Sequence, residues 1–140
     1  DPSKRIINWH EQHYTEGVAR NTATRRRFKR IARILKRLRD EMKEEGSATA
    51  KSAAAVTPSF LIECLVFNAK DAAFNLVEGS YYEDVKAVVS GLWNATKDDA
   101  ACSSFVEVSR KKILFAKTQP WTRDQAHAFL LSAWQHVGFK

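Results

Sequence analysis

The residues best suited to chemistry form one strongly basic stretch. Residues 25–39, RRRFKRIARILKRLR, contain nine Arg and Lys side chains in fifteen positions and no acid. The chain carries a net charge of +7, so its other 14 basic and 16 acidic residues sum to −2 and the positive charge is local. Like charges on neighbouring helical turns repel by roughly 0.2–0.5 kcal/mol per pair, and an anion would offset that repulsion. The stretch predicts a nucleic-acid backbone or a nucleoside triphosphate as ligand, with a merely solvated helix face as the alternative.

Patterns typical of catalysis are missing from the sequence. It has no paired carboxylates at metal-ligand spacing, no Gly-x-Ser-x-Gly elbow and no Walker-type glycine-rich loop. His10 and His13 lie three residues apart with no third ligand near them, which argues against a metal site. Cys64 lies in an apolar run, where a thiol behaves as a small hydrophobe and not as a nucleophile. We therefore expect no catalytic residue and no metal ligand in this chain.

Glu63 is the only charged residue among residues 59–67, SFLIECLVF. A carboxylate does not stay buried and charged without a partner. Structural ion pairs far outnumber catalytic acids of this kind. We therefore expect Glu63 to pair with an Arg of the basic stretch.

The basic stretch itself has the pattern of an amphipathic helix over residues 24–45, with Thr22 or Thr24 as its cap. Its apolar residues fall within one arc of a helical wheel, and its basic residues occupy the opposite arc. The apolar residues are Phe28, Ile31, Ala32, Ile34, Leu35, Leu38 and Met42. Lys29, Arg33 and Lys36 lie along one flank of the apolar stripe, where a basic side chain reaches a neighbouring cleft while its stem packs.

The remaining segments predict three more helices and three irregular regions. Thr57 and Pro58 begin a helix whose apolar residues cover all sides, so it belongs at the centre of the core. Capping boxes at residues 80–83 and 122–125 begin two further helices, the second of which ends at Gly138. Residues 1–24 read as an irregular segment and residues 44–57 as a mobile surface loop. Phe105, Val106 and Val108, within residues 96–120, fit either a short strand or a helical turn.

Length and composition predict one mainly α, compact helical domain over residues 1–140. Hydrophobic residues make up 44% of the chain, enough for a core of this size. Two cysteines are too few for a disulfide framework, which favours a reducing cytoplasm, and no apolar run has the length of a membrane span. The chain begins Asp-Pro-Ser-Lys without an initiator Met, so we expect a piece of a longer protein.

Three stretches, in consistent order along nearly the whole chain, carry a resemblance to a known family. The stretches are Asn8-Trp9 through Arg27-Phe28-Lys29-Arg30-x-x-Arg33-Ile34-Leu35-Lys36, Pro58-Ser59-Phe60-Leu61-Ile62-Glu63-Cys64-Leu65, and Leu114-Phe115 through Gln119-Pro120-Trp121-Thr122 to Gly138-Phe139. Together they resemble the C-terminal half of bacterial CD-NTases. This family makes cyclic oligonucleotides in CBASS anti-phage defence and is similar in fold to cyclic GMP–AMP synthase and oligoadenylate synthase.

The resemblance implies a helical domain that packs against a polymerase-β-like palm. In the family, the palm supplies a Gly-Ser motif and three acids that hold two Mg²⁺ ions, and none of these residues is in this chain. The fragment should therefore be inactive alone. A Lys on the long basic helix and a Ser at the start of the central helix contact the triphosphate in relatives, and Lys36 and Ser59 stand at the matching positions. Lys29 and Arg33 are weaker candidates for the same phosphates.

The resemblance also implies partners. These are nucleoside triphosphates, the palm of the same protein and CBASS accessory or effector proteins, in the bacterial cytoplasm and without a membrane. The alternatives that the basic stretch leaves open are a free-standing DNA- or RNA-binding module and a domain that binds an acidic protein.

Overall fold

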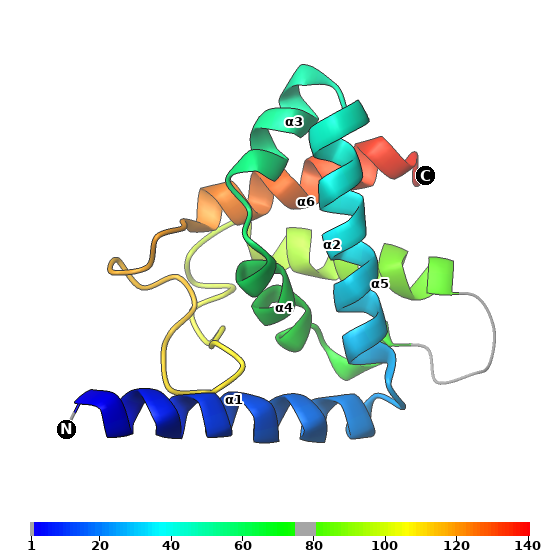
Figure 1. The fold of residues 1–140 in the computed structure, drawn as a ribbon. Coiled ribbons are helices and arrows are strands. Elements are labelled where there is room, and N and C mark those ends of the chain that lie inside the picture. The colour runs from blue at the N-terminus through cyan, green and yellow to red at the C-terminus, as the bar shows by residue number, and fades with distance from the viewer. Residues whose placement is uncertain (1, 75–80) are drawn as a thin grey trace.

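The computed structural model describes the backbone of residues 2–74 and 81–140 and the side chains of residues 11–74 and 81–140. These residues form helices joined by turns, and the only β feature among them is an isolated antiparallel bridge between Val106 and Ile113 (Figure 1). The predicted mainly α fold is confirmed. The elements are α1 (Pro2–Ala23), α2 (Arg27–Glu45), α3 (Ala48–Ala55), α4 (Ser59–Phe67), the 3-10 turn η1 (Asp71–Ala73), α5 (Tyr81–Ala95) and α6 (Arg123–Val137).

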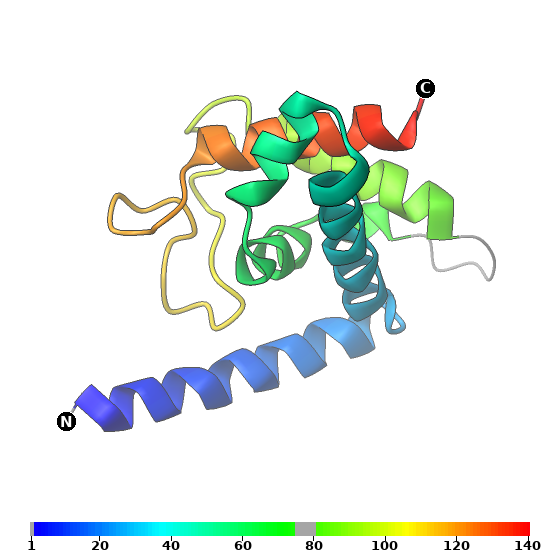
Figure 2. The ribbon, with the colours of Figure 1, turned by 45° about the horizontal axis from the view of Figure 1, so that its top comes forward.

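Helix α2 organises the bundle, because α3, α4, α5 and α6 all pack against it. Helix α1 runs along one edge of the bundle (Figure 2) and contacts it from His13 onward, where His13 reaches Glu63 of α4 and Arg20 reaches Asp71 of η1. The loop between α5 and α6 also reaches α1, through an ion pair between Arg110 Nε and Glu16 Oε2 at 2.9 Å. One side of α2 is therefore committed to the core, and its opposite side faces away from the other helices.

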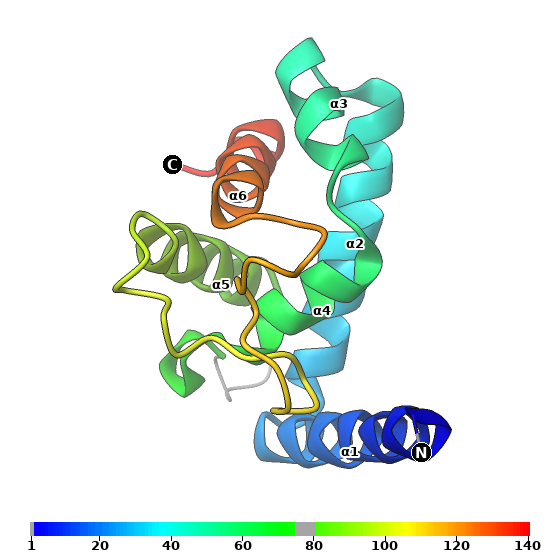
Figure 3. The ribbon, with the colours of Figure 1, turned by 90° about the vertical axis from the view of Figure 1, so that its left-hand side faces the viewer.

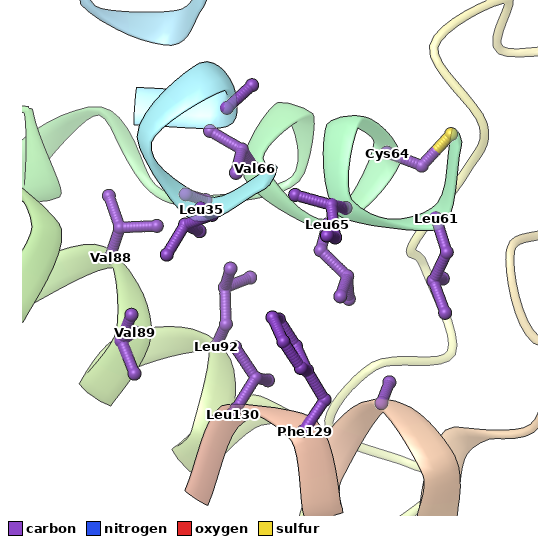
Figure 4. Packing of buried hydrophobic residues seen from close by; sticks show 14 of the residues in the cluster. Leu35, Leu61, Cys64, Leu65, Val66, Val88, Val89, Leu92, Phe129 and Leu130 are labelled. Atoms are coloured by element: carbon purple, nitrogen blue, oxygen red, sulfur yellow. The ribbon is translucent and has the colours of Figure 1, made fainter. Parts of the chain in front are cut away.

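The hydrophobic core is centred on α4, as the sequence predicts. Leu61, Ile62 and Val66 are fully buried, and each such side chain contributes about 1.5–3 kcal/mol through burial. Figure 4 shows Leu35 of α2 and Leu65 of α4 directed toward Leu92 of α5 and Phe129 of α6. This packing fixes how the polar side of α4 meets α2.

The prediction that residues 1–24 are irregular is wrong, because Pro2–Ala23 forms α1. The segment is mostly polar, and its few apolar residues give only a weak helical period, the signal on which the prediction relied. Local side-chain pairs support the helix instead, as where Gln12 Nε2 donates to Glu16 Oε1 at 2.8 Å, one turn later.

The predicted mobile loop at residues 44–57 is also wrong over most of its length, because Ala48–Ala55 forms α3. Ser47 caps this helix, its Oγ accepting a hydrogen bond from the Ala50 backbone N–H at 3.1 Å. Alanine has the highest helix propensity, and small side chains let α3 approach both α2 and α6 closely. Ala50, Ala53 and Ala54 are buried there, so these alanines are core residues.

The starts of α2 and α4 differ from the prediction in detail. Helix α2 begins at Arg27, but Thr24 Oγ1 still accepts from the Phe28 N–H at 2.9 Å, so Thr24 and not Thr22 supplies the cap. Helix α4 begins at Ser59 with Pro58 as N-cap and no side-chain cap. Thr57 does not cap it, because its hydroxyl donates to the Ala53 carbonyl of α3 at 2.8 Å.

The end of the chain matches the prediction closely. Thr122 and Gln125 form the predicted capping box of α6, and Gly138 ends that helix with φ of 83°, in the left-handed region that glycine tolerates. The other predicted capping box begins at Ser80, outside the described residues.

Residues 96–122 form turns around the isolated bridge, neither a regular strand nor a helix. The Asn68 side chain holds this segment by pairing with both backbone groups of Val106, donating to its carbonyl at 2.6 Å and accepting from its N–H at 3.0 Å. Trp121 Nε1 donates to the Leu114 carbonyl at 2.8 Å. Side chains therefore supply hydrogen bonds to backbone N–H and carbonyl groups that lie outside regular helices and strands.

No single helix in residues 2–74 and 81–140 has both the length and the apolar character to cross a membrane.

Candidate functional site

The basic flank of α2 meets α4 at an ion pair. Lys29 Nζ lies 2.9 Å from Glu63 Oε1, and His13 Nε2 of α1 lies 3.3 Å from Glu63 Oε2. The expected partner of Glu63 was an arginine, and its partners are a lysine and a histidine instead. The reason is geometric, since α4 crosses α2 on the flank that carries Lys29, whereas most arginines lie on the far side of the wheel.

The charges around Glu63 keep it ionised. Burial alone would raise the pKa of this carboxyl, but the hydrogen bond and charge of Lys29, with the charges of Lys36 and His13, outweigh burial and lower the pKa. Lys36 acts on Glu63 through its charge, whereas Lys29 also donates a hydrogen bond to it. Lys29 and Lys36 are two turns apart on α2, so one side of this helix presents both amines.

Ser59 and Glu63 are one turn apart on α4, so they project from the same side of that helix. Ser59 is exposed in the first turn, where no side chain caps the free N–H groups. A helix N-terminus of this kind attracts anions through those N–H groups and the helix dipole. The surface made by Lys29, Lys36, Ser59, Phe60 and Glu63 is hereafter the α2–α4 face.

Phe60 belongs to this face although the sequence pattern assigned it to the core. Its exposed fraction is 39%, whereas the apolar residues of α4 from Leu61 to Phe67 are buried. Its ring centroid lies 5.8 Å from those of His13 and Trp121, so the ring is held between α1 and the loop before α6. The clue in the sequence is that Phe60 lies between Ser59 and Glu63, at the end of α4 that carries its polar residues.

Arg33 and Lys36 also line an open groove of about 710 Å³ on the outer side of α2. We call it the arginine groove, lined by Asn21, Arg26, Arg30, Arg33, Ile34, Lys36, Arg37, Asp40 and Tyr81. The four residues predicted from the sequence are therefore divided. Lys29 and Ser59 belong to the α2–α4 face, Arg33 belongs to the groove, and Lys36 borders both.

Cys64 lies behind the α2–α4 face and is fully buried. Burial raises the pKa of its thiol to about 12, so it carries no thiolate at neutral pH. Among the residues with described side chains, no three His, Cys, Asp or Glu side chains gather as metal ligands, and Glu63 is already engaged by Lys29 and His13. The side chain of His10 lies outside that set.

Known proteins match this chain along nearly its whole length. The family model of the cGAS/DncV-like nucleotidyltransferase C-terminal helical domain matches residues 15–138. The chain is 38% identical over 137 residues to the cyclic dipyrimidine nucleotide synthase CdnE of Legionella pneumophila, covering 98% of this chain and 43% of that protein. It is 32% identical over 140 residues to a cyclic dipurine nucleotide synthase of Elizabethkingia meningoseptica, covering 100% of this chain and 45% of that protein.

The fold matches a solved structure as well. The Elizabethkingia meningoseptica CdnE cyclic dinucleotide synthase with GTP and Apcpp superposes with a TM-score of 0.79 at 31% identity, covering 92% of this chain and 44% of that one. The chain thus spans less than half the length of these relatives. Since the family model matches most of the chain and the fold agrees, the chain belongs to the family of cGAS/DncV-like nucleotidyltransferase C-terminal helical domains.

Proposed function

We propose that this chain is the helical half of a cyclic-oligonucleotide synthase and that its α2–α4 face binds the triphosphate of a nucleoside triphosphate. The observation that carries the proposal is that Lys29 contacts Glu63 at 2.9 Å and that Lys36 lies two turns later on the same flank of α2. Glu63 is the acid of this face, and Lys29 already neutralises it. Lys36 therefore supplies positive charge for a ligand.

Each polar group of the face has a separate role in this proposal. The Lys36 ammonium binds phosphate oxygens directly, and a charge-assisted hydrogen bond of this kind contributes about 1.5–3 kcal/mol. The Ser59 hydroxyl and the N–H groups of the first turn of α4 donate to the same phosphate chain. Lys29 remains paired with Glu63 and adds positive potential, and Arg33 acts from the border of the arginine groove.

The Phe60 ring is proposed to contact the nucleobase. It is exposed next to Ser59, and its packing against His13 and Trp121 holds it in a fixed orientation. An aromatic ring beside a phosphate site provides a flat apolar surface for a base, and such stacking contributes about 1–3 kcal/mol.

Magnesium is proposed to bind outside this chain. Mg²⁺ requires oxygen ligands, mainly carboxylates, and the carboxylate of the α2–α4 face, Glu63, is held by two basic side chains. The residues present therefore do not fit a Mg²⁺ site. The metal ligands and the catalytic acids would belong to a palm in the rest of the protein, so we expect the isolated chain to be inactive.

Further proposed partners are CBASS accessory or effector proteins, and the proposed location is the bacterial cytoplasm.

Replacing Lys36 in the full-length enzyme tests the phosphate assignment. Lys36→Ala should raise the KM for nucleoside triphosphate about tenfold, equivalent to about 1.4 kcal/mol, because one charged phosphate contact is lost. Lys51→Ala, on the exposed side of α3, removes the same charge elsewhere and should leave KM unchanged. Steady-state kinetics at varied triphosphate concentration give both values. An unchanged KM in Lys36→Ala would remove this residue from the site.

A further inference from the structure

The short connection between α3 and α4 decides where Ser59 lies. It consists of residues 56–58, and Figure 3 shows it running alongside α2. The Pro58 backbone is extended, with φ of −73° and ψ of 157°, and no side chain caps the helix that follows. The position of the first turn of α4 therefore depends on the contacts that the connection itself makes.

Arg39 of α2 holds this connection. Its Nη1 donates to the Thr57 carbonyl at 3.0 Å, while its Nε lies 3.0 Å from Asp40 Oδ1. The Arg39 side chain is 13% exposed, so water competes little for the bond to the carbonyl. Thr57 is also held by α3, because its hydroxyl donates to the Ala53 carbonyl at 2.8 Å. The residue before Pro58 is thus bonded to α2 and to α3 at once.

The same contact connects the two groups that the proposed phosphate site needs. Arg39 lies one turn after Lys36 on α2, and Thr57 lies two residues before Ser59. Two groups that grip one phosphate chain must keep their spacing, since a misplacement of about 1 Å can cost up to about 100-fold in rate. A bond from Arg39 to Thr57 sets the spacing between the Lys36 amine and the Ser59 hydroxyl.

Arg39 also lines an open groove of about 360 Å³ next to the start of α4. Lys43 lines the same groove and is exposed, whereas the guanidinium of Arg39 is engaged by Thr57 and Asp40. An anion that bound directly in this groove would use Lys43 at least as much as Arg39. The two residues therefore distinguish direct binding from positioning.

We propose that Arg39 is a positioning residue of the triphosphate site, which fixes Ser59 relative to Lys36 through the Thr57 carbonyl. The inference rests on the proposed function, because it requires Ser59 and Lys36 to bind the same phosphate chain. Arginine suits this role, since its planar guanidinium offers several donors in fixed directions and bonds Asp40 and Thr57 through separate nitrogens.

Kinetics of the full-length enzyme test this role with matched variants. Arg39→Met keeps the aliphatic stem and removes the donor, so it should raise the KM for nucleoside triphosphate about fivefold by weakening the contact of Ser59. Arg39→Lys retains a donor and should bring KM back to within about twofold of the unmodified enzyme. Asp40→Ala breaks only the exposed ion pair, and Lys43→Ala removes a charge from the same groove. Both should leave KM unchanged.

A double-mutant cycle separates positioning from a general loss of stability. If Arg39 acts through Ser59, Arg39→Met should have almost no further effect on KM in a Ser59→Ala background. Partial unfolding lowers the concentration of active enzyme and with it the apparent kcat, but it does not raise KM. Circular dichroism checks folding. If Arg39→Met unfolds, Arg39→Gln replaces it, because the glutamine amide nitrogen ends two bonds short of the Nη1 position.

The remaining outcomes overturn the inference in distinguishable ways. An unchanged KM in Arg39→Met, or additive effects of Arg39→Met and Ser59→Ala, would exclude Arg39 as a positioning residue and leave the phosphate assignments of Ser59 and Lys36 intact. An equal rise of KM in Lys43→Ala would show that the groove binds the ligand directly. An unchanged KM in Ser59→Ala would remove the serine from the proposed site, and the role of Arg39 would fail with it.

Discussion

At the scale of single residues, Glu63 connects three elements through its two oxygens. Lys29 of α2 and His13 of α1 contact different oxygens of the same carboxylate of α4. Because Glu63 lies one turn after Ser59 and interacts with the charges of Lys29 and Lys36, its own charge partly offsets the positive potential of the α2–α4 face. Glu63 therefore affects both the stability of the fold and the charge of the ligand site.

Replacing Glu63 by Gln should destabilise the chain in a pH-dependent way. The pKa of Glu63 is lowered from its usual 4.5, so its ion pairs stabilise the folded state above about pH 4.5, and that stability is lost as pH falls through the folded pKa. At pH 7 we expect a loss of about 1.5 kcal/mol, the lower end for charge-assisted bonds, because the Lys29 side chain is partly exposed. The difference from the unmodified protein should shrink below pH 4.5.

Urea unfolding of both proteins from pH 3 to pH 8 measures this difference. Glu44→Gln, an exposed acid in the last turn of α2, is the matched control and should show no comparable loss. A Glu63→Gln variant whose deficit is the same at pH 3 and pH 7 would mean that the ion pairs do not act as the structure indicates.

At the scale of elements, a buried ion pair connects α2 to α5. Arg27 Nη1 lies 2.6 Å from Asp84 Oδ2, and the Asp84 side chain is fully buried. Arg27 also lies over the Tyr81 ring, one turn of α5 earlier. This pair sets the position of α5 relative to the start of α2, and with it the position of Tyr81 beneath Arg30.

Replacing Asp84 by Ala should cost far more stability than replacing an exposed acid. Removing one partner of a buried pair costs about 3–5 kcal/mol, because the remaining charge loses its compensation. For a chain of this size we expect the melting temperature to fall by roughly 10 °C or more. Asp40→Ala breaks the exposed pair with Arg39 and should cost about 0–1 kcal/mol. Thermal unfolding followed by circular dichroism separates the two, and equal losses would contradict this account.

At the scale of the whole molecule, the sequence predicts the core better than its surroundings. The apolar stripes of α2 and α6 and the apolar circumference of α4 identify most buried residues, because burial leaves a clear period. The apolar period does not predict α1 or α3. Helix α1 is mostly polar, and α3 is built from alanines whose burial depends on the elements that pack against them. The sequence pattern does not predict the ion-pair partner of Glu63 either, because tertiary packing decides which flank of α2 meets α4.

In the candidate site, too, some features are predicted by the sequence and others depend on tertiary contacts. The flank position of Lys36 and the first-turn position of Ser59 follow from helical geometry, so the sequence predicts both. The separation of a triphosphate face from an arginine groove does not follow from it, because residues 25–39 read as one continuous basic surface. The contacts of Lys29 with Glu63 and of Arg30 with Tyr81 divide that surface into two.

The two cysteines provide a measure of how the whole core opens. Cys64 lies in the central helix and burial raises the pKa of its thiol to about 12, whereas Cys102 is buried in the less regular segment between α5 and α6. Local opening is easier in segments with few regular hydrogen bonds.

In a Cys102→Ser variant, Cys64 should therefore react with a thiol reagent only as fast as the whole chain unfolds. In a Cys64→Ala variant, Cys102 should react sooner, through local opening. In denaturant, the remaining cysteine of either variant should react at once. Labelling rates measured across low urea concentrations test this, because global opening accelerates with urea and local opening does not. If Cys64 were labelled as fast as a free thiol, α4 would not be the closed centre on which the α2–α4 face depends.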